Sequence, residues 1–265
     1  MLQLSGRRNM MNRQAETWRP MLPPPPKNVL AHLADAVRRF LDLQACSVWK
    51  DLSQILPQVR GTLVDVGCGM QPYRRLLGAD ARYVGIDTAD AKEHFGCEMP
   101  DTTYYAGATW PVADASADAV LCTETLEHVA EPQEFLREAA RCLHPGGLLI
   151  LTVPFAARWH FIPHDYWRYT PSGLGRLLTR TGFVNASVYA RGNALTVACY
   201  KSMALMLPLI LPQRGGVVLK LLKRIAGIPL VPLLFLAAGI ANLSLRGRGG
   251  DDCLGYTVLA EKRAS

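Results

Sequence analysis

The stretch Leu63-Val-Asp-Val-Gly-Cys-Gly69 decides the fold of this 265-residue chain. Its first four residues predict a buried strand, and its two glycines predict a tight turn at the carboxyl end of that strand. Glycine also lets a ligand approach the backbone closely, because it carries no Cβ. The stretch therefore predicts a nucleotide-binding turn between a strand and a helix expected over 72–77.

A second strand, Tyr83-Val-Gly-Ile86, follows along the chain and leads directly into Asp87. A carboxylate at this place, one strand after a glycine turn, can accept hydrogen bonds from both hydroxyls of a ribose. The glycine turn and Asp87 together indicate a ligand that contains adenosine.

Two classes of adenosine ligand share this arrangement, and two residues favour one of them. The dinucleotide fingerprint requires a third small residue where this chain has Pro72. Asp65 places a negative charge where a pyrophosphate would be repelled and a cationic ligand attracted. S-adenosylmethionine fits better, since it carries a sulfonium and an α-ammonium but no phosphate. A nicotinamide-dependent oxidoreductase is the less favoured alternative.

Short apolar runs alternate with amphipathic helical stretches through the middle of the chain, and this order predicts a doubly wound, parallel α/β sheet. The expected strands are 63–66, 83–86, 119–122, 148–153 and 184–189, and the expected helices are 28–44, 48–56, 72–77, 132–143 and 172–181.

Four ordered motifs, at 64–69, 85–87, 123–129 and 135–147, resemble those of the class I S-adenosylmethionine-dependent methyltransferases, type 11-like among them. Residues 254–262 are similar to the last, antiparallel strand of that fold. The resemblance implies a mainly parallel seven-stranded sheet with a hydrophobic, basic insert before the last strand. Many members carry a third glycine where this chain has Gln71, which predicts a less open loop.

The resemblance also implies a set of cofactor-binding residues. The glycine turn would line the methionine side of S-adenosylmethionine, Asp87 would bind the ribose, and Thr123 would lie under the methionyl group. Many members hold the adenine with an acidic residue after the third strand, which this chain lacks, so we expect backbone near Ala108 to replace it. The expected cofactor-binding residues are Asp65, Gly67, Cys68, Gly69, Asp87, Ala108 and Thr123.

Histidines and aromatic residues crowd the segment 159–169, directly after the expected fifth strand. Such a loop overhangs the ligand crevice of a doubly wound sheet. His164 beside Asp165 predicts a general base for the methyl acceptor, with a purely structural role as the alternative. Glu127 is interpreted as an acid that complements a helix dipole. No metal-binding residues are predicted.

The segment 166–250 contains eleven Lys and Arg and no acidic residue. It also holds the two most apolar runs, 203–212 and 227–245, and between them 217–225 predicts a helix with separate basic and apolar faces. This composition predicts association with an anionic membrane surface. A helical subdomain packed on the enzyme or a homodimer contact is the alternative. Nucleic acid is not expected, because stacking aromatics do not accompany the basic residues.

Four parts are therefore expected: a flexible lead-in at 1–26, a methyltransferase domain at 27–193, a membrane-associating insert at 194–250, and the last strand and tail at 251–265. Scattered cysteines without a C-x-x-C pair, and no apolar stretch typical of a signal peptide, predict a reducing, cytoplasmic setting. The expected function is methyl transfer to a small-molecule, lipid or lipid-linked glycan acceptor at the inner membrane face. A non-catalytic, membrane-tethered module that binds S-adenosylmethionine is the alternative.

Overall fold

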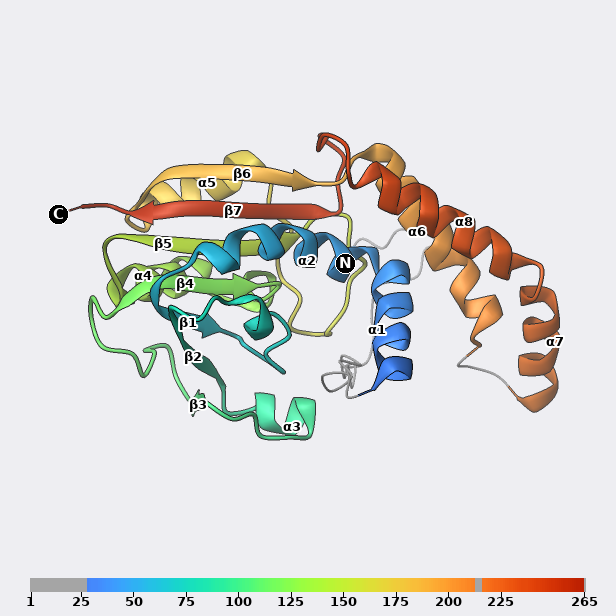
Figure 1. The fold of residues 1–265 in the computed structure, drawn as a ribbon, viewed down its shortest axis with the longest axis horizontal. Helices are drawn as coiled ribbons and strands as arrows, with labels where there is room; N and C mark the ends of the chain where they lie inside the picture. The colour runs from blue at the N-terminus through green and yellow to red at the C-terminus, as the bar shows by residue number, and fades with distance from the viewer. Residues whose placement is uncertain (1–27, 213–215, 265) are drawn as a thin grey trace, which may run out of the picture.

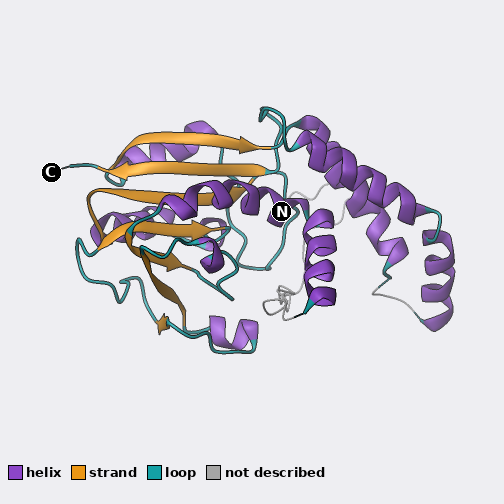
Figure 2. Ribbon diagram, in the orientation of Figure 1, coloured by secondary structure: helices purple, strands orange, loops and turns teal. Residues whose placement is uncertain are grey.

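In the computed structural model, residues 28–212 and 216–264 are described, and they form a seven-stranded sheet with helices on both faces (Figures 1 and 2). The lead-in expected at 1–26 lies outside these residues. The strands are β1 (Gly61–Val66), β2 (Ala81–Thr88), β3 (Thr102–Tyr105), β4 (Ala117–Thr123), β5 (Leu143–Pro154), β6 (Phe183–Arg191) and β7 (Gly255–Lys262).

The strand order is β3-β2-β1-β4-β5-β7-β6. Strands β1 to β5 pair in parallel, and β7 runs antiparallel to both of its neighbours, β5 and β6. The predicted doubly wound, mainly parallel seven-stranded sheet is confirmed. The strand order reverses between β1 and β4, because β2 and β3 lie on one side of β1 and β4 and β5 on the other. A crevice opens at the carboxyl ends of these two strands, where such sheets bind ligands.

Helices cover both faces of the sheet (Figure 2). The α-helices are α1 (Val29–Leu41), α2 (Leu43–Ile55), α3 (Ala91–Phe95), α4 (Pro132–Cys142), α5 (Pro171–Arg180), α6 (Ala194–Ile210), α7 (Val217–Gly227) and α8 (Leu230–Ser244). On one face, α2 packs Val48 and Leu52 against Leu121 and Ile150 of the sheet. On the other face, apolar side chains of α4 and α5 join a larger core with β1, β4 and β5. The two cores hold the sheet rigid beneath the crevice.

The helix expected over 72–77 is wrong: the structure has only a 3-10 turn, η2 (Arg74–Leu76), after the glycine loop. Gln71, in place of glycine, adopts a positive φ of 53°. Its side-chain amide donates hydrogen bonds to Pro100 O (2.5 Å) and Thr102 Oγ1 (2.8 Å). The side chain of Gln71 is thereby held against the start of β3, and the backbone at this residue does not have the helical conformation that would start a helix.

The boundary between the first two helices also differs from the prediction of 28–44 and 48–56. The side chain of Asp42 accepts a hydrogen bond from the backbone N–H of Ala45, which caps α2 at Leu43. An N-cap of this kind starts a new helix wherever its side chain satisfies the first free N–H groups. Helix α1 therefore ends at Leu41, and α2 is longer than expected.

In the described part of the insert, helices α6, α7 and α8 lie beside one end of the sheet (Figure 1). Buried residues of α6 and α8, such as Met203, Leu234 and Ala238, form a core with Leu43 of α2. The opposite faces carry exposed side chains, and α7 exposes Val217, Val218, Leu219, Leu221, Leu222 and Ile225. Part of the insert is thus packed on the rest of the protein, as in the alternative interpretation, and part presents apolar surface to solvent.

Among the described residues, no single helix is long and apolar enough to cross a bilayer. Helices α7 and α8 have the length and apolar composition of a membrane span only when they are taken together. The chain bends by 58° at the break between them. Pro229 lies at this break, as the N-cap residue of α8.

Replacing Ile150 with alanine should lower the free energy of unfolding by about 2–5 kcal/mol, because Ile150 is fully buried between α2 and the sheet. The matched control is Ile225→Ala on α7, where the side chain is 56% exposed and the expected change is within about 0.5 kcal/mol. Urea denaturation followed by circular dichroism measures both. Equal losses in the two variants would contradict the assignment of Ile150 to the core.

Candidate functional site

A cavity of about 920 Å³ opens at the carboxyl ends of β1, β2, β4 and β5. The glycine loop and Asp87 line one part of it. Residues of the loop after β5 line another, and α2 and α6 contribute Ala45 and Tyr200. The cavity therefore joins the two groups of residues that the sequence singled out, 67–87 and 159–169, into one site.

The glycine loop turns back immediately after β1. The backbone N–H of Gly67 donates to Ile86 O at 2.9 Å, which ties the loop to β2. Gly67 has a φ of 67°, and a Cβ at this position would lie 2.5 Å from Cγ2 of Thr125. Glycine is required here both for the backbone conformation and for the close approach of the loop that follows β4.

Asp87, at the end of β2, is placed as the sequence predicts. Its Oδ2 accepts a hydrogen bond from Gly69 N and its Oδ1 accepts one from Thr88 N, both at 2.8 Å. These bonds orient the carboxylate at the cavity wall beside the glycine loop. The arrangement suits recognition of a pair of ribose hydroxyls.

Asp65 and Cys68 lie beneath the loop. Asp65 is buried and is not among the described residues that line the cavity; its Oδ2 accepts a hydrogen bond from Tyr83 Oη at 2.8 Å. Burial raises the pKa of Asp65 to about 7. The structure therefore separates Asp65 from the cavity wall, where the sequence had placed it. Cys68 contributes to the wall, but its side chain is 2% exposed and burial raises the pKa of its thiol to about 12.

Ala108 and Thr123 both line the cavity. Thr123 ends β4, and Ala108 follows β3 between Tyr105 and Trp110, which also line the cavity. The expected adenine position is thus next to aromatic rings and exposed backbone, an environment in which a purine can pack and hydrogen-bond.

The loop after β5 is fastened to a short 3-10 turn, η3 (Leu126–His128), that follows β4. The backbone N–H of Tyr166 donates to Glu127 O at 2.9 Å, and Trp167 Nε1 donates to Val129 O at 2.9 Å. The Tyr169 hydroxyl donates to Leu126 O at 3.3 Å. These bonds join segments about 40 residues apart and fix the cavity wall opposite the glycine loop.

The predicted pairing of His164 with Asp165 is not what the structure shows. His164 lines the cavity, and its Nδ1 lies 3.2 Å from Tyr166 Oη. Asp165 is directed away from it: its carboxylate accepts hydrogen bonds from Arg168 at 2.6 and 2.8 Å and from His160 N at 3.0 Å. Burial raises the pKa of Asp165, but the hydrogen bonds from Arg168 and from His160 N, together with the charges of these two residues, hold that pKa below its ordinary value. Neighbours in an irregular loop need not face the same way.

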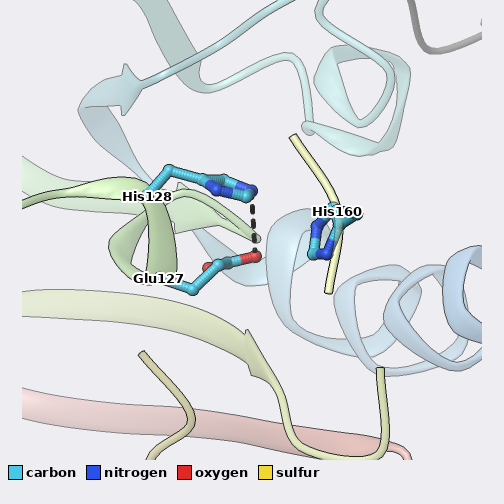
Figure 3. Close-up of side chains that lie close together, drawn as sticks. All are labelled: Glu127, His128 and His160. Atoms are coloured by element: carbon cyan, nitrogen blue, oxygen red, sulfur yellow. Dashed lines mark ion pairs between the residues drawn. The ribbon is translucent and has the colours of Figure 1, made fainter. Parts of the chain in front are cut away.

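The structure instead brings together Glu127, His128 and His160 (Figure 3). Glu127 is completely buried in the three-residue turn η3, ahead of α4 (Pro132–Cys142), so it does not lie at the start of the helix whose dipole it was expected to complement. Burial raises its pKa well above the ordinary value, and burial lowers the pKa of His128 to about 4. His128 is therefore a neutral imidazole near pH 7. The Glu-His dipeptide was visible in the sequence, but its proximity to His160 was not.

The ion pair of Arg191 with Glu124 is a second feature of the site that was not predicted from the sequence. Arg191, at the end of β6, is 2% exposed and donates hydrogen bonds to Glu124 Oε1 (2.7 Å), Ser47 Oγ and Val153 O (both 3.0 Å). Glu124 lines the cavity beside Thr123. The pair ties β4, β5, β6 and α2 together at the crevice, and its members lie 67 residues apart.

Comparison with known families and structures finds methyltransferases. The family model described as a methyltransferase domain, type 11, matches residues 64–151, which run from β1 into β5. An uncharacterized methyltransferase of Mycobacteroides abscessus is 36% identical over 127 residues, 44% of this chain and 47% of that protein. A ubiquinone biosynthesis O-methyltransferase of Parvibaculum lavamentivorans is 34% identical over 122 residues, 42% of this chain and 44% of that protein. The chain thus spans about half the length of these curated relatives.

The fold has a similar counterpart among solved structures. A SAM-dependent methyltransferase from Archaeoglobus fulgidus superimposes with a TM-score of 0.52, covering 89% of this chain and 100% of the other at 15% identity. Identity this low shows a shared fold only. The strand order, the glycine loop with Asp87, and the match over residues 64–151 together identify a class I S-adenosylmethionine-dependent methyltransferase domain in this chain.

Proposed function

We propose that this protein transfers the methyl group of S-adenosylmethionine to an amphipathic or lipid-linked acceptor that is presented at a membrane surface. One observation carries the proposal: a single cavity is lined by the glycine loop and Asp87, by the histidines after β5, and by Tyr200 of the apolar insert. Relatives that are ubiquinone biosynthesis O-methyltransferases support an oxygen atom as the methyl acceptor.

The residues present fit the cofactor. Asp87 would hold the ribose hydroxyls, the backbone of Gly67 and Gly69 would border the methionyl part, and Trp110 with Ala108 would border the adenine. When bound, S-adenosylmethionine supplies an electrophilic methyl group on a sulfonium. The protein aligns an acceptor with that methyl group and excludes water, and such positioning is a large source of rate.

His164 is proposed to receive the proton of the acceptor hydroxyl. It lines the cavity and is held by the Tyr166 hydroxyl, so its ring can face a bound acceptor. Asp165 is proposed to position His164 and not to exchange a proton itself. Its hydrogen bonds with Arg168 and His160 hold the loop that carries His164. The lowered pKa of Asp165 keeps it anionic and these bonds intact near neutral pH.

Membrane association is proposed through the exposed faces of the insert. Apolar side chains on α7, on α8 and at the break between them are exposed, such as Leu222 (58%), Leu236 (60%) and Ile228 (67%). Nearby Lys220, Lys223 and Arg224 would contact anionic headgroups. An alternative is a second copy of the chain on this surface. The acid-free composition from 166 to 250 favours the anionic membrane, since two copies would bring like charges together.

The first prediction concerns the ribose contact. Asp87→Ala should weaken S-adenosylmethionine binding by about 1–3 kcal/mol, because the ribose hydroxyls lose their acceptor. Asp80→Ala is the control, since Asp80 lies on the surface with its side chain 71% exposed. Isothermal titration calorimetry measures both. Unchanged affinity in Asp87→Ala, or saturable binding of NAD in its place, would contradict the cofactor assignment.

The second prediction concerns the loop after β5. His164→Ala should lower turnover by about 10²–10⁴-fold while leaving cofactor affinity nearly unchanged, as expected of a general base. Asp165→Ala should lower turnover as well, through the loss of loop order. Exposed His144 provides the control variant His144→Ala. Methyl transfer from labelled S-adenosylmethionine into lipid extract provides the measurement, and full turnover in His164→Ala would exclude the role.

The third prediction concerns the membrane surface. Removing the whole insert would expose the core that α6 and α8 share with Leu43, so substitutions on α7 are the better test. Replacing Val217, Val218, Leu221 and Ile225 together by serine should reduce binding to phosphatidylglycerol vesicles and to phosphatidylcholine vesicles, because buried apolar area is lost.

A matched charge variant separates the two contributions to binding. Replacing Lys220, Lys223 and Arg224 by glutamine should weaken binding to phosphatidylglycerol vesicles by about 1 kcal/mol per charge and leave phosphatidylcholine binding unchanged. Vesicle co-sedimentation measures both sets. A wild-type protein that ignores vesicles of either charge, and that forms a dimer disrupted by the serine variant, would favour the copy-to-copy contact.

A further inference from the structure

The cluster of Glu127, His128 and His160 is the feature that the methyl-transfer proposal leaves unused. One donor atom from each residue lies within 4.8 Å of the other two, and the Nε2 of His128 is 3.7 Å from Oε1 of Glu127 (Figure 3). The residues come from η3 and from the loop after β5, and the two histidines line the cavity.

Glu127 is the first sign that a ligand belongs in this cluster. Its side chain is 1% exposed, and neither carboxylate oxygen has a hydrogen-bond partner among the described residues. A buried carboxylate without hydrogen bonds is costly unless a proton or a cation neutralises it. The close-up shows this carboxylate directed toward the rings of His128 and His160 (Figure 3).

The histidine tautomers are the second, independent sign. The Nδ1 of His128 lies 2.9 Å from His164 O, and since a carbonyl only accepts, Nδ1 carries the hydrogen. The lone pair of Nε2 therefore faces Glu127. The Nδ1 of His160 lies 2.9 Å from Arg158 O and 3.1 Å from Asp165 Oδ2, which assigns its hydrogen in the same way. Backbone carbonyls and carboxylates orient metal-binding histidines in this manner.

We propose that Glu127, His128 and His160 bind one divalent transition-metal ion of the Zn²⁺ class. Two imidazoles and one carboxylate suit Zn²⁺, Co²⁺ or Fe²⁺ better than Mg²⁺ or Ca²⁺, which prefer oxygen donors. Donors about 2.0 Å from a tetrahedral ion lie about 3.3 Å apart, so side-chain movements of about 1 Å would close the site. Asp165 would not bind the ion itself; its carboxylate contacts Nδ1 of His160 and orients that ring.

Three protein donors leave a coordination position open, as in catalytic zinc sites. Because His128 and His160 line the cavity, that position faces the space next to His164. An acceptor oxygen bound there would be held at the cavity wall opposite the glycine loop; this consequence alone rests on the proposed methyl transfer. Metal binding itself does not depend on it.

The test uses untagged, full-length protein from which a chelator has removed bound metal. The protein is titrated with Co²⁺, and the visible absorption of the bound Co²⁺ measures binding. Zn²⁺ is then added as a competitor. Wild type should bind one equivalent with the absorption of a nitrogen- and oxygen-ligated tetrahedral ion. Glu127→Gln, His128→Asn and His160→Asn should each weaken binding by at least about 10-fold. His144→Asn, at an exposed histidine outside the cavity, should bind as wild type does.

Circular dichroism checks that each variant is folded, and His160→Asn, in the loop, keeps the test valid if Glu127→Gln does not fold. Thiolate absorption would assign the ion to a cysteine and overturn the proposal. Stoichiometric binding that survives in all three folded variants would also overturn it. Absence of binding by the wild-type protein would overturn the proposal too.

Discussion

The pairing of β1 with β2 on one side and β4 on the other is the constraint on which the rest of the site depends. All three strands run in parallel, so Gly67, Asp87 and Thr123 emerge at the same edge of the sheet. The bond from Gly67 N to Ile86 O and the contact between Gly67 and Thr125 then bring the three strand ends close together. A side chain at Gly67 would separate them, and the cavity would lose its floor.

The opposite wall is held by a different kind of interaction. The loop after β5 has no regular structure of its own between β5 and α5, and it is positioned by hydrogen bonds to the backbone of η3 and its successor Val129. Glu127 belongs both to this wall and to the cluster. Its backbone carbonyl accepts a hydrogen bond from the loop backbone, and its buried carboxylate lies next to the ring of His128. Loop order and the Glu127–His128–His160 cluster are therefore parts of one arrangement.

The insert contributes a residue to the cavity and an exposed apolar surface to the outside of the protein. Tyr200 of α6 reaches the cavity, and the same helix shares a core with α8 and α2. The outer faces of α7 and α8 keep their apolar side chains in solvent. Helix α6 therefore joins the cavity wall to the helices whose exposed faces are proposed to meet the membrane.

The sequence by itself determined the sheet, the glycine loop and Asp87, because these depend on local patterns: apolar runs, glycine where φ is positive, and a carboxylate at a strand end. It also predicted the amphipathic insert from composition. It failed at residues 72–77, where Gln71 adopts a positive φ and its side chain binds residues about 30 positions away. Only the tertiary structure decided that Asp165 bonds Arg168 instead of His164, that Glu124 pairs with Arg191, and that Glu127 meets His160. Each of these depends on side-chain direction or on contacts between distant segments, and a pattern of neighbours along the chain contains neither.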